Sequence, residues 1–266
     1  MTRSAYRLSA GSRSRRRLAM LQSESAEVPE LETAGSDDAA GSWDIAPDPL
    51  MSEVEETESL RVIRRLVLGS RPANWVFCGD GITHAVEDGR TDRSFPELFA
   101  QRVRWDHRRL LDTVITTAAS GTRCAALAAS IELQALRFRP DVVAVLLGLT
   151  DSLAGPGGRE TFEAGLNDLV DQLTVPGAVV LMQTPHRVLL KGNERYTDLP
   201  AYVEIIRHVA AATEVILVDH WADWGGDERM AADWADWLLD DGRHPNGRGH
   251  RRMAGLLSHV LGIGST

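Results

Sequence analysis

Two side chains near the C-terminus have the types and the spacing of a proton-transfer pair. Asp241 and His244 lie three residues apart in the sequence Asp-Gly-Arg-His-Pro. A carboxylate that accepts a hydrogen bond from one ring nitrogen of a histidine orients the ring and leaves the other nitrogen free to act as a base. The short spacing lets both side chains belong to one loop. The pair therefore predicts general-base chemistry on a hydroxyl group or on a water molecule.

Polar loops, most of them containing glycine, follow the segments that we expect to be strands. In a parallel sheet the residues just after each strand gather at one edge, and glycine lets the backbone approach a ligand closely there. We expect Asp80, Asp151 and His186 to contact a ligand at this edge. The loops are 79–83, 120–122, 148–151 and 184–186.

Short apolar runs alternate with segments of helical periodicity along most of the chain. A continuous apolar run such as 142–147 is typical of a strand buried on both faces, and such alternation predicts an α/β fold with a parallel sheet. The strands are expected at 75–78, 113–117, 142–147, 178–182 and 215–218, and the helices at 95–103, 125–138, 162–173, 199–212, 230–239 and 247–261.

The N-terminal residues differ in composition from the remainder. Residues 1–51 open with arginine and serine and continue with acidic and small residues, which supply little apolar surface for folding. We therefore expect a disordered tail, with docking to a protein partner as its possible role and Met51 as an alternative start of the chain. Ser52 can cap a helix that ends near Leu68, so the folded domain is expected at 52–263.

Composition narrows the partners and the location. The 266 residues are 43% hydrophobic, which is enough for one sizeable core, and the net charge of −9 argues against nucleic acid or an anionic membrane as a partner. No apolar run reaches the ~20 residues of a membrane span, and no secretory signal is visible. Two cysteines exclude a disulfide framework, and no metal-ligand spacing occurs. We expect a cytoplasmic protein with no metal or other cofactor and a small-molecule ligand.

The loop motifs, taken in order, resemble those of the SGNH or GDSL-type hydrolase family. Gly79-Asp80-Gly81-Ile82-Thr83 resembles the first block, Ser120-Gly121-Thr122 the second, Gly148-Leu149-Thr150-Asp151 the third and Asp241 to Pro245 the last. The resemblance covers Trp75 to about Leu261. It implies a flavodoxin-like three-layer α/β/α sandwich with a five-stranded parallel sheet, and ester hydrolysis as the family's activity.

The resemblance also implies roles for single residues. Asp241 and His244 match the orienting acid and the base, and Gly121 matches the glycine whose N–H stabilises the oxyanion. Gly81 stands where the family has its serine nucleophile, and Thr150 stands where it has an asparagine that donates to the oxyanion. Without a hydroxyl at position 81 the covalent route is closed, and loss of one oxyanion donor typically lowers the rate by ~10² to 10³.

Two functional hypotheses follow from these departures. The first is a protein that has lost ester hydrolysis, or retains little of it, and binds an acyl or carbohydrate-type ligand. The second is an esterase, acyl hydrolase or transferase in which the His244–Asp241 pair activates water or a substrate hydroxyl. Among other candidate nucleophiles, Ser120 matches an ordinary motif position, we expect the Thr83 hydroxyl to hydrogen-bond within its turn, and Cys124 is expected to be buried. The polar loop 184–198 is expected to form a wall of the pocket.

Overall fold

The computed structural model describes residues 57–85, 92–174, 176–225 and 234–263. The expected tail at 1–51, the alternative start at Met51 and the expected cap at Ser52 lie outside these residues. The first described helix, α2 (Glu58–Leu68), is instead capped by Thr57, whose hydroxyl accepts a hydrogen bond from the N–H of Leu60.

A five-stranded parallel sheet forms the centre of the described fold, with the strand order β2-β1-β3-β4-β5. This is the order of flavodoxin-like folds. It confirms the predicted α/β class and the number of strands. The strands are β1 (Asn74–Gly79), β2 (Thr113–Thr116), β3 (Val142–Leu146), β4 (Val179–Gln183) and β5 (Ile216–Val218).

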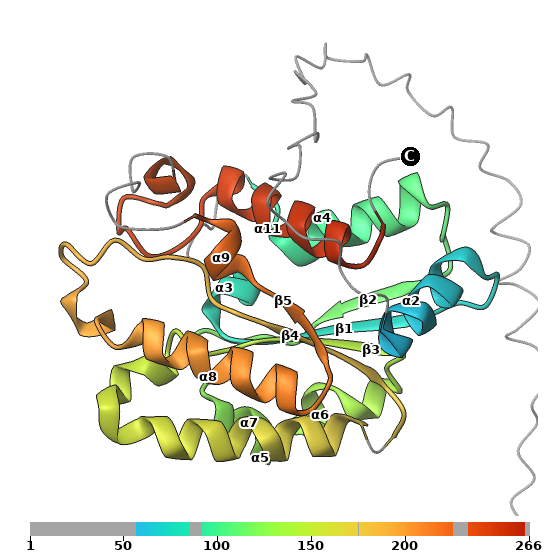
Figure 1. Cartoon of the computed structure of the whole chain (residues 1–266). Helices are drawn as coiled ribbons and strands as arrows, with labels where there is room; N and C mark the ends of the chain where they lie inside the picture. Colours follow the sequence, from blue (N-terminus) through green and yellow to red (C-terminus); the bar gives the residue numbers. More distant parts are fainter. Residues whose placement is uncertain (1–56, 86–91, 175, 226–233, 264–266) are drawn as a thin grey trace, which may run out of the picture. The chain divides into compact units, whose positions relative to one another are not determined.

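Helices cover both faces of the sheet (Figure 1). The α-helices after α2 are α3 (Gly81–His84), α4 (Phe95–Gln101), α5 (Cys124–Ala129), α6 (Ile131–Gln134), α7 (Arg159–Thr174), α8 (Leu199–Ala212), α9 (His220–Asp223) and α11 (Gly247–Val260). A π-helical segment, η1 (Arg102–Asp106), and the 3-10 segments η2 (Leu136–Phe138), η3 (Asp151–Gly158), η4 (Glu194–Tyr196) and η6 (Ala235–Trp237) complete the described elements.

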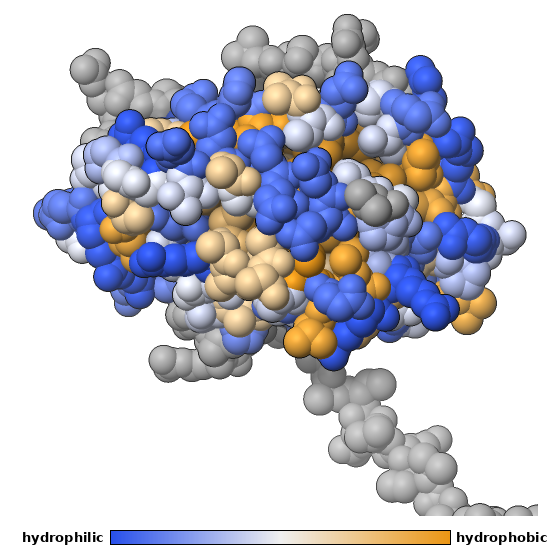
Figure 2. Space-filling model, turned by 90° about the horizontal axis from the view of Figure 1, so that it is seen from below, coloured by the Kyte–Doolittle hydropathy of each residue, from blue (hydrophilic) through white to orange (hydrophobic). Residues whose placement is uncertain are grey.

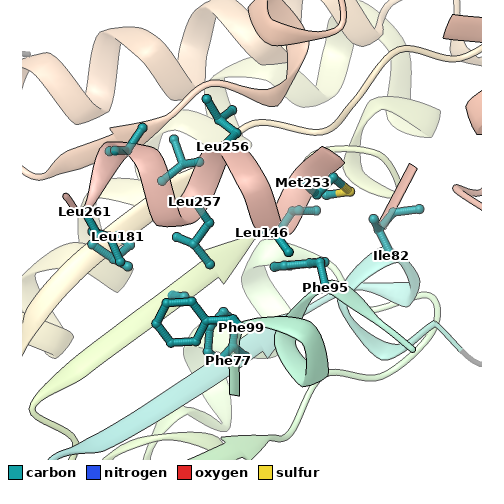
Figure 3. Packing of buried hydrophobic residues seen from close by; sticks show 14 of the residues in the cluster. Phe77, Ile82, Phe95, Phe99, Leu146, Leu181, Met253, Leu256, Leu257 and Leu261 are labelled. Atoms are coloured by element: carbon teal, nitrogen blue, oxygen red, sulfur yellow. The ribbon is translucent and has the colours of Figure 1, made fainter. Parts of the chain in front are cut away.

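Alternation along the strands divides the core into two layers. Trp75 and Phe77 point to the layer formed with α4 and α11, while Val76 and Cys78 point to the layer formed with α5, α7 and α8. In the first layer, Phe77 packs against Phe95 and Phe99 of α4, under the leucines of α11 (Figure 3). Both faces of the central strands are thus buried, which is why these strands read as continuous apolar runs.

The layer of α5 and α7 has an outer surface on which hydrophilic and hydrophobic residues are interspersed (Figure 2). Helix α7 buries one stripe, which includes Phe162, Leu166 and Leu169, and leaves its other side to solvent. This amphipathic pattern is what made the helix recognisable in the sequence.

Two helices expected from the sequence differ in the structure. The single helix expected at 125–138 is broken into α5, α6 and η2. The Ser130 hydroxyl donates to the carbonyl of Ala126, and Ser130 leaves helical geometry at φ −121°. Serine often competes with the helical backbone in this way. Of the helix expected at 230–239, residues 230–233 lie outside the described residues, Trp234 is helical, and η6 follows it before Leu238 forms a β-bridge with Pro245.

Gly79, at the end of β1, cannot carry a side chain. Its φ is +140°, and a Cβ placed on it would lie 2.0 Å from the carbonyl oxygen of Leu146 in β3. We expect Gly79→Ala to lower the free energy of unfolding by about 3 kcal/mol or more, since two central strands would have to separate. Urea unfolding followed by circular dichroism measures this change.

The matched control for that variant is Gly177→Ala. Gly177 also has a positive φ, of +88°, but a Cβ there meets nothing within 4 Å. It should therefore cost only about 1 kcal/mol, the penalty for a left-handed backbone. Equal losses in the two variants would contradict the steric explanation.

Candidate active site

Asp241 and His244 form the predicted pair in one tight loop between Leu238 and Pro245. His244 Nδ1 lies 2.5 Å from Asp241 Oδ2, so Nδ1 carries the proton and Nε2 is left as the basic nitrogen. The other carboxylate oxygen, Oδ1, accepts hydrogen bonds from the backbone N–H groups of Arg243 and His244, both at 3.0 Å. These hydrogen bonds and the contact with His244 outweigh partial burial and lower the pKa of Asp241 to about 2. The aspartate is therefore ionised at neutral pH.

The loop after β4 stabilises this turn through three hydrogen bonds to its backbone carbonyls. His186 Nε2 donates to the carbonyl of Arg243 at 2.8 Å, and Asn193 Nδ2 donates to the carbonyl of Asp241 at 2.8 Å. The N–H of Leu189 donates to the carbonyl of Gly242 at 2.8 Å. His186 is fully buried. In this structure it positions the turn of Asp241 and His244, and direct ligand contact by His186 stays a prediction.

Gly81 lies at the first position of the short helix α3, directly after β1. Asp80 caps the helix, because its Oδ1 accepts a hydrogen bond from the N–H of Ile82 at 3.1 Å. Asp80 is almost completely buried. Contact between Asp80 and a ligand stays a prediction. Gly81 has no positive φ, and its conformation is one that other residues adopt. The loop therefore presents a helix N-terminus at the place where the sequence motif would present a serine.

Three groups that could stabilise an oxyanion are uncommitted. The N–H of Gly81, the N–H of Gly121 and the hydroxyl of Thr150 have no hydrogen-bond partner among the described residues. They follow β1, β2 and β3, which are neighbours in the sheet. In Figure 1, α11 begins at the same end of the sheet as α3, and His244 comes shortly before α11 in the sequence.

Asp151 fastens two of these loops together. Its Oδ1 accepts from the N–H of Cys124 at 2.9 Å, and its Oδ2 accepts from the N–H of Gly148 at 3.2 Å. Burial raises the pKa of Asp151 above its usual value. With both oxygens engaged, Asp151 positions the loops that carry Gly121 and Thr150, and its contact with a ligand remains a prediction.

None of the other candidate nucleophiles is activated by the described residues. Burial raises the pKa of Cys124 to about 12, and the thiol is 1% exposed, as expected. Thr83 is completely buried, and its hydroxyl has no partner among the described residues, so the expected hydrogen bond within its turn is wrong. Ser120 is exposed, and its Oγ lies 3.5 Å from Nδ1 of His84, at the limit of a hydrogen bond.

Three neutral histidines lie buried near the loop of Asp241 and His244. Burial lowers the pKa of His186 and of His220 to about 3 and that of His250 to about 4. His220 Nε2 lies 3.0 Å from Oε1 of Gln183, and His250 Nδ1 accepts from the N–H of Phe95 at 3.3 Å. Within the described ranges, no three His, Cys, Asp or Glu side chains come together as metal ligands would.

The sequence did not single out the contact between Arg243 and the carboxylate of Asp241. Arg243 Nε donates to Asp241 Oδ2 at 3.1 Å, so the oxygen that orients His244 also pairs with a guanidinium. Asn193 was missed as well. The signal for Arg243 was its position between the aspartate and the histidine of the motif. Asn193 gave no signal, because it is a single asparagine within a long polar loop.

Comparison with known proteins agrees with this geometry. A family model, GDSL-like Lipase/Acylhydrolase, matches residues 77–252. No curated protein matches the chain. Of the described residues, no helix is both long and apolar enough to cross a membrane.

Solved structures share the fold at low sequence identity. A catalytic mutant of Axe2, an acetylxylan esterase from Geobacillus stearothermophilus, is 19% identical with a TM-score of 0.60, covering 71% of this chain and 94% of that one. A GDSL-like lipase from Parabacteroides merdae is 22% identical with a TM-score of 0.62, covering 73% and 97%. LAE5, an α/β hydrolase enzyme from the metagenome of Lake Arreo, is 23% identical with a TM-score of 0.57, covering 73% and 98%.

At such identities the similar structures show the fold alone. The family match is stronger, because it spans well over half of the chain and includes Gly79 to Thr83, the loops after β2 and β3, and Asp241 with His244. This chain therefore belongs to the GDSL-like lipase/acylhydrolase family.

Proposed function

We propose that this protein binds an acyl ester, carried on a small molecule or a carbohydrate, without hydrolysing it through a covalent intermediate. The observation that carries the proposal is Gly81 at the first position of α3. The position has no side-chain oxygen to attack a carbonyl. Among the described alternatives, Cys124 is a buried thiol and Thr83 a buried hydroxyl, while the exposed Ser120 reaches His84 only at 3.5 Å.

The ligand class is supported by what remains of the site. The N–H groups of Gly81 and Gly121 and the hydroxyl of Thr150 are uncommitted donors, which suit a carbonyl oxygen. An acetylated carbohydrate is a reasonable first choice, because structures of an acetylxylan esterase are among those that share the fold. Binding without turnover needs only these donors and a cleft.

A second function is favoured by the intact Asp241–His244 pair. With its Nδ1 proton held 2.5 Å from Asp241, His244 has the tautomer that a general base requires. It could activate a water molecule in the space that a serine side chain would fill. This would be slow hydrolysis, or transfer to a substrate hydroxyl, without an acyl-enzyme.

One experiment separates the two functions. We expect purified wild-type protein to hydrolyse p-nitrophenyl acetate and acetylated xylooligosaccharides no faster than His244→Ala does, while NMR titration of the ¹⁵N-labelled protein detects binding of the acetylated sugar. The control is His208→Ala, because His208 is a largely exposed histidine on α8. Wild-type turnover that disappears in His244→Ala and persists in His208→Ala would overturn the non-hydrolytic function and support the second one.

A further inference from the structure

Two arginines converge on one phenol oxygen beside the catalytic pair. Arg195 Nη2 donates to the hydroxyl oxygen of Tyr196 at 3.2 Å, and Arg243 Nη1 donates to the same oxygen at 3.4 Å. The guanidinium of Arg195 also lies over the Tyr196 ring, 5.0 Å from its centroid. Tyr196 itself is buried, so its hydroxyl fixes the place at which the two cations meet.

Of these two cations, only Arg243 has a carboxylate partner among the described residues. Arg243 pairs with Asp241 Oδ2, so its charge is matched by that carboxylate. Among the described residues Arg195 makes no ion pair, although the neighbouring Glu194 is available on the same short helix. Glu194 instead accepts a hydrogen bond from the N–H of Gly192 at 2.9 Å. Two like charges held together in this way repel each other, and an anion placed between them would relieve the repulsion.

The arginine pair is tied to the catalytic turn by short connections. Arg243 is the residue before His244, and Arg195 belongs to η4, in the loop whose Asn193 holds the carbonyl of Asp241. The side chain of Arg243 is 29% exposed, so a ligand at His244 can reach it. Guanidinium groups bind carboxylates, sulfates and phosphates through paired hydrogen bonds.

We propose that Arg195 and Arg243, joined by Tyr196, form a subsite for a negatively charged group on the ligand. The proposal rests on the proposed function for its ligand class and narrows it to an acyl ester or sugar that carries a carboxylate or a sulfate. The charged group binds at the arginine pair, and the acyl group lies toward His244. Neutral sugars bind beside His244 without this contact.

A matched pair of probes tests the subsite directly. p-Nitrophenyl β-D-glucuronide and p-nitrophenyl β-D-glucoside differ only in a carboxylate against a hydroxymethyl group, and neither is an ester. We expect the glucuronide to bind about fivefold more tightly, the range of a partly exposed ion pair. The preference should shrink as salt rises from 50 to 500 mM. Binding is followed by NMR chemical-shift titration of the full chain.

Variants assign the preference to the two arginines. Arg195→Gln and the double variant Arg195→Gln/Arg243→Gln should bind the glucuronide and the glucoside equally. Lys191→Gln is the matched control, because Lys191 is an exposed cation of the same loop, and it should keep the preference. A preference that survives in the double variant, or one that disappears in Lys191→Gln, would overturn the assignment.

A second measurement does not depend on any sugar. Titration of the wild-type protein with sodium sulfate at constant ionic strength should shift the Nε–H resonance that is missing from Arg243→Gln. It should have little effect on the one missing from Arg71→Gln, because Arg71 pairs with Asp141 at the opposite edge of the sheet. Absence of a sulfate shift, together with equal binding of the two glycosides, sinks the subsite. If sulfate binds but neither glycoside does, the carbohydrate ligand fails and the anion subsite stands.

Discussion

Gly81→Ser is expected to raise the rate of p-nitrophenyl acetate hydrolysis about 10³-fold above the wild-type protein. The conformation of Gly81 at the start of α3 is an ordinary one, so serine can replace it without backbone strain. Its hydroxyl would lie at a helix N-terminus, in a site whose Asp241–His244 pair is already formed at 2.5 Å. The variant would therefore regain the one missing group of a serine hydrolase triad.

The magnitude follows from two opposing effects. In a serine protease, removal of the nucleophile lowers kcat by roughly 10⁶. Restoring the serine should recover only part of this factor, because Thr150 replaces an asparagine donor and one oxyanion donor contributes about 10² to 10³ in rate. The double variant Gly81→Ser/Thr150→Asn should thus exceed Gly81→Ser by a further factor of about 10².

Three controls make this result interpretable. Gly81→Ser/His244→Ala should fall back to the wild-type rate, whereas Gly81→Ser/His208→Ala should keep the gain, because His208 lies on α8 and is largely exposed. A fluorophosphonate should add its mass to Gly81→Ser and not to the wild-type protein. If Gly81→Ser is folded, unlabelled and inactive, the cleft is not arranged for acyl transfer.

Below pH 6.5 the folded protein is expected to lose stability steeply, by about 4 kcal/mol per pH unit, since each proton taken up only by the unfolded chain contributes about 1.4 kcal/mol. His186, His220 and His250 are buried and neutral, with pKa values lowered to about 3, 3 and 4 from an ordinary value of 6.5. Between pH 6.5 and about 4 the unfolded chain binds three protons that the folded chain does not. Stability is therefore full above pH 6.5 and is lost as the pH falls toward the folded pKa values.

Asp241 affects the stability in a different pH range from the histidines. Its contacts lower the pKa of Asp241 to about 2, so its contribution is present above about pH 4 and is lost only below that. Urea unfolding at pH 7.5, 6.5 and 5.5 therefore reports chiefly on the histidines. His250→Gln should reduce the slope by about one proton, whereas His208→Gln should leave it unchanged. A total slope below one proton would show that the buried histidines are hydrated or already charged.

The fold could be predicted from the sequence because its signals are local. The runs at β1, β3 and β4 are apolar on both faces, so a parallel sheet covered by helices was the consistent arrangement. The break of the helix at Ser130 was not predictable from apolar spacing, because it depends on a serine hydroxyl that bonds to the backbone of the preceding turn. The end of the helix expected at 230–239 was not predictable either, since Leu238 leaves the helical pattern to pair with Pro245 across the turn of Asp241 and His244.

In the candidate site, too, the residues marked by local sequence could be predicted, and the contacts between distant residues could not. Asp241 and His244 were found because they are close in sequence, and Gly81 was found because it interrupts a recognisable motif. The support given by Asn193 and the contact between Arg195, Tyr196 and Arg243 join residues about fifty positions apart, and no periodicity announces such contacts. The roles of Asp80, Asp151 and His186 also depended on burial, which one sequence does not reveal.

The two carboxylate oxygens of Asp241 make different contacts. Asp241 Oδ2 orients the ring of His244, but Asp241 Oδ1 ties the turn together through the N–H groups of Arg243 and His244. A chain that lost its nucleophile would still depend on this aspartate to close the loop and to start α11 in the right place. The motif can thus outlive the reaction for which it is known, as a folding requirement of its own turn.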